Sequence, residues 1–217
     1  MKNQAGKVAP TRKLRVLGVA AHPDDLEIGC GGTLLKMHEA GYEIYLAIMT
    51  FGEAGGNAAV RRKEQEAAGR AFGVRKIYWM GHEDTRVRVD RTAIEGMDRV
   101  LREVGPDLVF ANYAEDTHQD HRSTATIVLS SARYTQNVLF YEVPTTMNFT
   151  PEVFVDITGT VEKKCSLLRV HRSQWRTLRV GDLTAVDCAR SMALFRGVQG
   201  RVKAAEGFAP LRLLFKV

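Results

Sequence analysis

Apolar runs and helical patterns alternate along the first half of this chain, and no other feature limits its fold as strongly. Leu14 to Ala21 is an unbroken apolar run typical of a central parallel strand, and Ile28 to Ala40 then follows with helical spacing. The alternation continues with predicted strands over 43–50, 76–80 and 108–111 and predicted helices over 60–72 and 92–104. This order predicts an α/β fold with a Rossmann-like, mostly parallel central sheet and helices on both faces.

The second half of the chain continues the same domain. Beyond Asp120 the pattern predicts a helix that ends near residue 133, strands over 138–143 and 153–157, and helices over 160–171 and 183–198. A length of 217 residues with 45% apolar content suits one globular domain with a sizeable core. We therefore expect a single domain over 14–217, preceded by a flexible basic tail over 1–13.

The composition excludes several classes of protein. No apolar run reaches the length of a membrane span, and the first thirteen residues lack the apolar segment of an export signal. Cys30, Cys165 and Cys188 are odd in number and widely spaced, which argues against a disulfide framework or a thiolate zinc site and favours a reducing cytoplasm. The net charge of +6 would suit an anionic ligand, although a solvated surface is the simpler interpretation of each arginine group.

Two short clusters of histidines and acidic residues indicate the chemistry. His22-Pro23-Asp24-Asp25 follows the first predicted strand, and His118-Gln119-Asp120-His121 follows the fourth. Ligands of open α/β sheets bind beyond the carboxyl ends of the strands, and these two strands flank the usual switch point, so we expect the clusters to meet in one crevice. Catalytic zinc takes three protein ligands, often two imidazoles and one carboxylate, and leaves a position for water. The clusters supply these ligand types with spares and predict a metal-dependent hydrolase.

The same segments resemble the motifs of the PIG-L or LmbE-like deacetylases, zinc enzymes that remove acetyl groups from N-acetylglucosamine-type sugars. Residues 21–27, with the glycines at 29, 31 and 32, resemble the first motif of that family, and residues 118–121 resemble the second. Shorter matches extend the resemblance over nearly the whole chain after residue 13: Thr50 to Gly55, Arg61 with Glu64, His171 to Gln174, and Glu206 to Phe208.

The resemblance implies a role for each residue of the candidate site. Three side chains would hold zinc: His22, Asp25 and His121. Three would take part in catalysis: Asp24 as the base, with His118 and Asp120 assisting the transition state. Four would contact the sugar: Glu53, Arg61, Gln174 and Glu206.

The chemistry of these side chains agrees with such roles. Zinc lowers the pKa of its bound water to about 7, and Asp24, left outside the ligand set, could take a proton as the metal-bound water attacks an amide carbonyl. A protonated His118 could share the oxyanion with zinc, while Asp120 hydrogen-bonds an imidazole, fixes its tautomer and raises its pKa. Either His118 or Asp24 could protonate the leaving amine. Fe²⁺ is an alternative to zinc, because two histidines and one carboxylate also suit non-haem iron.

Simpler interpretations compete with this one. An Asp-Asp pair after a strand can cap the next helix and complement its dipole, and Glu53 or Arg61 can face solvent. The competing function is a catalytically silent metal-containing carbohydrate-binding or regulatory protein, which would need neither Asp24 nor His118. The fingerprints of dinucleotide-binding proteins, α/β-hydrolases and P-loop proteins are absent from the sequence.

We therefore predict an enzyme that removes an N-acetyl group from an N-acetylglucosamine-type sugar or conjugate. Its partner would be a small amino-sugar conjugate, for which an anionic group is the weaker hypothesis. We expect no nucleic-acid partner, a homo-oligomer and a cytoplasmic location. Residues 81–86 replace a turn that is often Asp-Gly in the family, so the loop that faces the sugar differs here and leaves the sugar's identity open.

Overall fold

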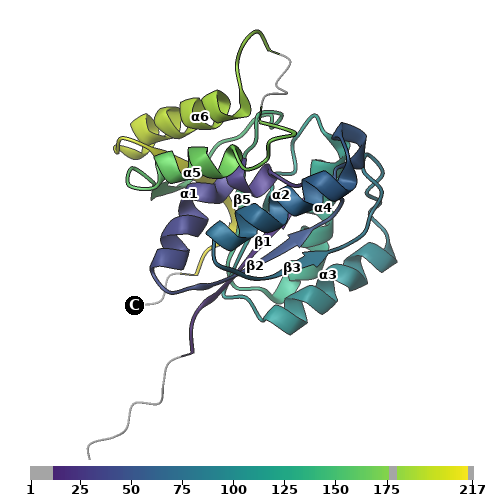
Figure 1. Ribbon diagram of the computed structural model, residues 1–217. Helices are drawn as coiled ribbons and strands as arrows, with labels where there is room; N and C mark the ends of the chain where they lie inside the picture. Colours follow the sequence, from purple (N-terminus) through teal and green to yellow (C-terminus); the bar gives the residue numbers. More distant parts are fainter. Residues whose placement is uncertain (1–11, 176–179, 215–217) are drawn as a thin grey trace, which may run out of the picture.

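The computed structural model describes residues 12–175 and 180–214 and contains the expected alternation of strands and helices (Figure 1). Five strands run parallel: β1 (Arg15–Ala20), β2 (Glu43–Ile48), β3 (Val74–Trp79), β4 (Leu108–Asn112) and β5 (Val138–Tyr141). With β6 (Val153–Asp156) and β7 (Ala205–Arg212) they form one seven-stranded sheet in the order β3-β2-β1-β4-β5-β7-β6. The predicted mostly parallel sheet is confirmed.

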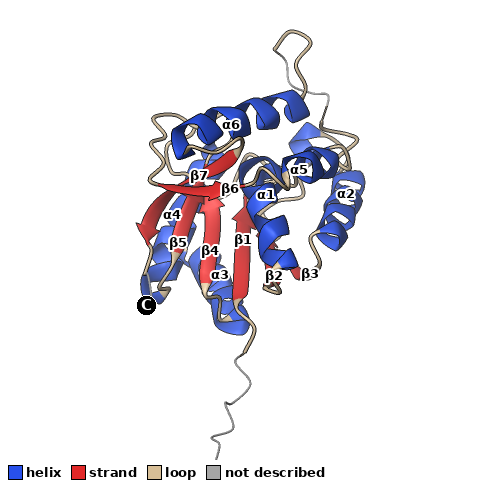
Figure 2. Ribbon diagram, turned by 90° about the vertical axis from the view of Figure 1, so that its left-hand side faces the viewer, coloured by secondary structure: helices blue, strands red, loops and turns tan. Residues whose placement is uncertain are grey.

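Helices cover both faces of this sheet (Figure 2). One face carries α1 (Asp25–Glu39), α2 (Ala58–Ala71) and α5 (Val161–Leu168), and the other carries α3 (Arg91–Val104) and α4 (Gln119–Ser131). Alternate residues of β1 point to opposite faces, so Val16 and Ala20 pack in the core under α1 while Leu17 and Val19 pack against α3 and α4. The last helix, α6 (Ala185–Gly200), packs on β6, β7 and α5.

Strand β7 was not predicted from the sequence, which is a correction to the expected elements. Its segment contains Glu206, Gly207 and Pro210, residue types that are depleted in strands. β7 is antiparallel to both of its neighbours, and β6 pairs only with residues 205–208. Pro210, which has no N–H to donate, therefore lies beyond the part of β7 that pairs on both sides.

Helix α1 approaches its neighbours closely because the middle of the helix contains glycines. A Cβ atom added to Gly29 would lie 2.1 Å from the ring of Tyr141, and one added to Gly32 would lie 2.9 Å from Ile157. Only glycine allows that approach, which brings the start of α1 directly over the ends of the central strands.

The predicted N-terminal tail lies mostly outside the described residues. Of its last part, Arg12 donates two hydrogen bonds of 2.7 and 2.9 Å to the carboxylate of Asp107. Among the described residues, none of the helices combines the length and apolar character that crossing a bilayer requires.

Candidate functional site

The two clusters predicted to converge do lie together at the carboxyl ends of β1 and β4. Residues 22–25 form the turn between β1 and α1, and residues 118–121 form the start of α4. The Nδ1 atom of His22 lies 3.2 Å from Nε2 of His121, although 99 residues separate the two histidines in the chain. Both side chains are buried, with relative exposures of 7% and 5%.

Donor atoms of three residues, with both carboxylate oxygens of Asp25, have distances close to those between metal ligands. Besides the 3.2 Å between the two imidazoles, Asp25 Oδ1 lies 3.5 Å from His121 Nε2 and Asp25 Oδ2 lies 3.7 Å from His22 Nδ1. Ligands held about 2.0–2.1 Å from a tetrahedral zinc ion are about 3.3 Å from one another. The donors of His22, Asp25 and His121 therefore fit around one such ion with little movement.

The second nitrogen of each histidine faces carboxylates. His22 Nε2 lies 3.1 Å from Asp84 and 3.2 Å from Asp120, and His121 Nδ1 lies 3.1 Å from Asp116. Burial lowers the pKa of His121, but Asp25 and Asp116 outweigh that effect and raise it to about 9. The pKa of His22 is raised in the same way, because its carboxylate neighbours outweigh burial. Carboxylates in this position fix the ring orientation of histidines that bind metals.

Two triads of donors lie within 4.8 Å of one another among the described residues, and neither includes Asp25: His22 with Asp84 and Asp120, and His22 with His118 and His121. The carboxylates of the first triad already accept backbone N–H groups, from Thr85 and Val87 at Asp120 and from Ala54 at Asp84. In the second, His118 Nδ1 accepts the N–H of Asp120. Asp25 Oδ2 likewise accepts the N–H of His22, so the choice of His22, Asp25 and His121 as the ligand set stays the one that the family resemblance implies.

Asp24 stands beside this set without being part of it. It precedes the first residue of α1, but its side chain caps no helix N–H, unlike a simple N-cap aspartate. Its φ of 93° lies in the left-handed region, which few residues other than glycine adopt. The side chain keeps 18% of its surface exposed and lies 3.5 Å from Arg61 Nη2. Burial raises the pKa of Asp24 to about 6, although Arg61 and His171 act to lower it.

His118 occupies the N-cap position of α4, where its Nδ1 accepts the N–H of Asp120. A ring whose Nδ1 accepts carries its proton on Nε2 when it is neutral. Burial lowers the pKa of His118, as do the nearby His22 and His121 rings. The structure thus favours a neutral His118 that donates from Nε2, rather than the protonated ring expected from the sequence.

Comparisons with known proteins agree with these motifs. The family described as PIG-L: GlcNAc-PI de-N-acetylase matches residues 17–132, more than half of the chain. The chain belongs to the PIG-L family. It is 31% identical to the N,N'-diacetylchitobiose deacetylase of Pyrococcus horikoshii, with a TM-score of 0.78 over 91% of this chain and 83% of that one.

Two further relatives extend the comparison. The diacetylchitobiose deacetylase of Thermococcus kodakarensis is 27% identical, and the match covers 89% of this chain and 81% of that protein. The 4-carboxy-2-hydroxymuconate hydratase GalB of Pseudomonas putida KT2440 is 22% identical with a TM-score of 0.79, over 94% of this chain and 99% of that one, and shares the fold.

Three of the residues expected to contact the sugar hold the loops of this PIG-L site. The guanidinium of Arg61 is buried and donates to the carbonyl groups of Gly52 and Pro23. Gln174 donates to the carbonyl of Gly55. Glu53 is exposed and accepts the N–H of Asp84. All three lie near the turn that carries Asp24 or the loop that carries Asp84, and each has a partner within the protein.

Glu206 is placed differently from the expectation. Its carboxylate is 3% exposed, lies 2.6 Å from Lys164 Nζ and accepts the N–H groups of Gly32 and Thr33. Both oxygens are thus occupied inside the fold. The position of Glu206 gives no support to a contact with substrate and indicates a structural role instead.

Asp120 contacts an imidazole, as expected from the sequence, and the imidazole is that of His22. It is fully buried, and its contacts are with His22 Nε2 and the backbone of residues 85 and 87. Its effect on any reaction would pass through the orientation of His22.

The sequence did not single out several residues that complete the site. Asp116 and Asp84 face the two histidines, and Asn112 donates to Asp25 Oδ2 over 3.3 Å. Asn112 ends β4 and Asp116 follows four residues later, so a polar residue at a strand end was an available signal for both. Asp84 lies in the segment noted for its departure from the family.

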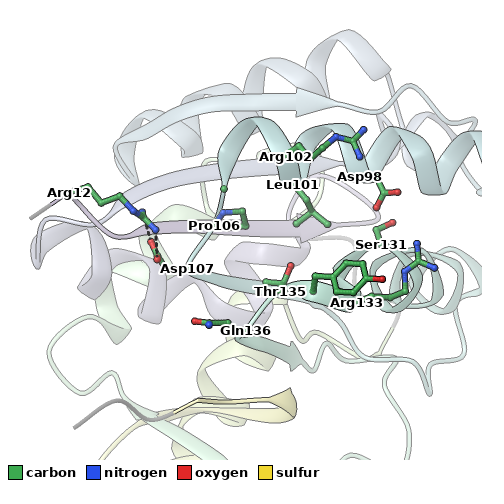
Figure 3. A pocket seen from close by; sticks show the side chains of 12 residues that line it. Arg12, Asp98, Leu101, Arg102, Pro106, Asp107, Ser131, Arg133, Thr135 and Gln136 are labelled. Atoms are coloured by element: carbon green, nitrogen blue, oxygen red, sulfur yellow. Dashed lines mark hydrogen bonds and ion pairs between the residues drawn. The ribbon is translucent and has the colours of Figure 1, made fainter.

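A cavity of about 630 Å³ elsewhere in the molecule does not belong to this site (Figure 3). Its walls come from the end of α3, the end of α4 and the segment before β4, including Arg102, Asp107 and Ser131. These segments lie at the amino ends of the parallel strands, whereas His22 and His121 lie at the carboxyl ends.

Proposed function

We propose that this PIG-L protein is a zinc-dependent hydrolase that removes the N-acetyl group of an N-acetylglucosamine-type sugar or conjugate. Its family and its similarity to diacetylchitobiose deacetylases support a deacetylase that acts on amino sugars. The observation that carries the proposal is Asp24, a partly exposed carboxylate with a raised pKa that lies beside the donor set and outside it. A site that bound metal only for structure would not need it.

Zinc fits the donors of His22, Asp25 and His121 by their spacing and by the carboxylate behind each imidazole. A zinc ion there would supply a Lewis acid and a water of lowered pKa. Fe²⁺ is the alternative, because the same donor set suits it. Metal analysis of protein purified without oxygen separates the two ions.

The protein's own groups would then move the protons. Asp24, with a pKa of about 6, is ionised at neutral pH and accepts a proton from the attacking water more readily than an ordinary carboxylate would. His118 donates a hydrogen bond from Nε2 to the carbonyl oxygen as negative charge develops there. Such a hydrogen bond lowers the barrier by about 3 kcal/mol. Because neutral His118 only donates, Asp24 passes its proton on to the leaving amine.

Acetate release tests this function, measured with and without a chelator on a panel of N-acetylglucosamine conjugates. We expect Asp24→Ala to lower kcat by about two to four orders of magnitude while the metal content stays near that of the unchanged protein. If Asp24→Ala keeps its activity, the assigned base is wrong. If the unchanged protein releases no acetate from any conjugate, a silent carbohydrate-binding protein becomes the better interpretation.

Asp90 provides a matched control for the idea that Asp24 is only a helix cap. Asp90 is the N-cap residue of α3, and its side chain accepts the N–H of Ala93. We expect Asp90→Ala to cost about 1 kcal/mol of stability, as is usual for a lost cap, with kcat unchanged.

Three expectations about the protein's surroundings stay proposals. The three free cysteines support a reducing cytoplasm. The net charge of +6 supports an anionic group on the sugar, which a comparison of rates on neutral and anionic conjugates tests. The exposed apolar residues Leu194, Phe195 and Val198 of α6 support a homo-oligomer, which light scattering after gel filtration tests.

A further inference from the structure

Side chains from another helix hold the two peptide groups that flank Asp24. The N–H of Asp24 donates to Gln65 Oε1 over 3.0 Å, and the carbonyl of Pro23 accepts from Arg61 Nη2 over 2.9 Å. Asp24 has φ 93° and ψ −21°, a left-handed conformation that persists in a non-glycine residue only when its surroundings impose it. Contacts from outside the turn are therefore part of what sets its direction.

Gln65 and Arg61 reach this turn from the same face of α2. They are four residues apart, so they lie one above the other on the helix. Gln65 is fully buried and Arg61 is 5% exposed. Because water has little access there, a lost contact at Asp24 would have no ready replacement.

Glu27 determines which way the amide of Gln65 points. Its carboxylate is fully buried, and Oε1 accepts from Gln65 Nε2 over 2.8 Å. An ionised carboxylate only accepts and a backbone N–H only donates, so the amide satisfies both partners in one of its two orientations. The oxygen of Gln65 is thus kept facing Asp24.

His171 faces Glu27 from the opposite side. His171 Nε2 lies 3.4 Å from Glu27 Oε1, close enough for an ion pair, although neither ring nitrogen makes a well-aimed hydrogen bond in the described structure. Burial lowers the pKa of His171, but Glu27 and Asp24 outweigh burial and raise it. A positive charge on His171 would compensate that of Glu27.

We propose that Gln65 is a positioning residue, which holds the backbone of Asp24 in its left-handed conformation through an amide that Glu27 keeps in one orientation. The inference rests on the proposed function, because the position of Asp24 affects a rate only if Asp24 is the base. Gln65 itself touches neither the substrate nor the metal donors in this assignment.

Gln65→Leu, which keeps the size of the side chain and removes the acceptor, tests the proposal. We expect kcat to fall roughly 10- to 100-fold, as misplaced catalytic groups do, with KM and metal content unchanged. The amide hydrogen of Asp24 should also exchange with solvent faster than in the unchanged protein. A kcat within about twofold of the original, or a loss of metal together with activity, overturns the proposal.

A reciprocal exchange separates the acceptor from general packing. In the double variant Gln65→Glu with Glu27→Gln, a carboxylate oxygen accepts from Asp24 and the new amide at position 27 donates to it. We expect this variant to recover most of the kcat and the slow exchange that Gln65→Leu loses. If it folds and binds metal but stays as slow as Gln65→Leu, the hydrogen bond to Asp24 is not what matters.

Ser173→Ala is the matched control, in a loop that contacts the same helix from outside. The N–H and hydroxyl of Ser173 both donate to Glu64, the neighbour of Gln65 on α2, so the change loosens α2 without removing the contact to Asp24. We expect a lower melting temperature with unchanged kcat and unchanged exchange at Asp24. A loss of kcat equal to that of Gln65→Leu would show a general effect of α2 and overturn the proposal.

The exchange measurement keeps this inference distinct from the proposed function, since it needs no substrate. A protein that releases no acetate while Gln65→Leu still speeds exchange at Asp24 would refute the function and keep the backbone assignment. If the protein releases acetate while exchange at Asp24 is unchanged in Gln65→Leu, the proposed function stands and the positioning role of Gln65 is refuted.

Discussion

Glu206 offers a test that separates a structural role from the substrate contact expected from the sequence. Its carboxylate connects three parts of the fold: β7, which carries it, Lys164 on α5, and the N–H groups of Gly32 and Thr33 on α1. These N–H groups follow a break in α1, where Cys30 has non-helical φ and ψ angles of −141° and 18°. Glu206 thus caps the second part of α1, where a negative charge is favourable.

The burial of this pair sets the size of the expected effect. Lys164 is 2% exposed and Glu206 is 3% exposed, so Glu206→Ala would leave a buried ammonium without its partner. Breaking a buried ion pair from one side costs about 3–5 kcal/mol, and two unpaired N–H groups add at least about 2 kcal/mol, so we expect a loss of at least about 5 kcal/mol. Such a loss approaches the whole stability of many domains. Glu206→Gln, which keeps one acceptor oxygen, should lose about half as much.

Urea unfolding of Glu206→Gln, together with its steady-state kinetics, distinguishes the two roles. If the role of Glu206 is structural, the Glu206→Gln variant has a lower free energy of unfolding than the unchanged protein. Its folded fraction then keeps the original KM. The double variant Glu206→Leu with Lys164→Met should regain part of the loss, because apolar replacement of both charges removes the unpaired ammonium. Unchanged stability with a KM raised about tenfold would refute this reasoning and return Glu206 to the substrate site.

The metal donors lead to two further predictions. Asp116→Asn removes the carboxylate behind His121 and should weaken zinc binding about 10- to 100-fold, measured by competition with a chelator; unchanged affinity would contradict the orienting role of Asp116. The pKa of His121 is raised to about 9 by Asp25 and Asp116, and its Nε2 lies 3.2 Å from His22 Nδ1, so the two facing nitrogens share one proton at pH 7 in the metal-free protein. Zinc should therefore release about one proton at pH 7 and bind more tightly as pH rises toward 9, which calorimetry in buffers of different ionisation enthalpy measures. Release of no protons would exclude these two ligands.

Periodicity was sufficient for the parallel half of the fold, because apolar runs such as those of β1 and β4 alternate there with segments of helical spacing. The strand at Leu14 to Ala21 and the helix after it were predicted within a few residues of β1 and α1. β7 was not predicted, because its own residues, with Glu206 and Pro210, do not form a strand pattern. Its place in the sheet depends on antiparallel partners that are distant in sequence.

The meeting of the two clusters was predictable from topology, since His22 and His121 follow strands that are neighbours in any sheet of this order. The contacts of the accessory residues were not predictable. Arg61 and Gln174 match the family motif at positions that could face either the sugar or the protein. In the fold, Arg61 donates to the carbonyl of Gly52 and Gln174 donates to that of Gly55. A motif match identifies a residue near a site but not the atoms it touches.

The charges around the donor atoms explain why the site can exist before it binds metal. Asp25, Asp84, Asp116 and Asp120 surround His22 and His121, and this excess of negative charge raises the pKa values of both rings. When a zinc ion enters, the proton shared by the two facing ring nitrogens is released, which offsets part of the charge that the ion brings. The carboxylates that orient the rings thus have two effects. Without metal they balance the positive charge of a protonated ring, and with metal they polarise the neutral ring that acts as a ligand. Replacing Asp116 by asparagine should therefore lower the pKa of His121 in the metal-free protein as well as weaken zinc binding, because both effects come from the same carboxylate.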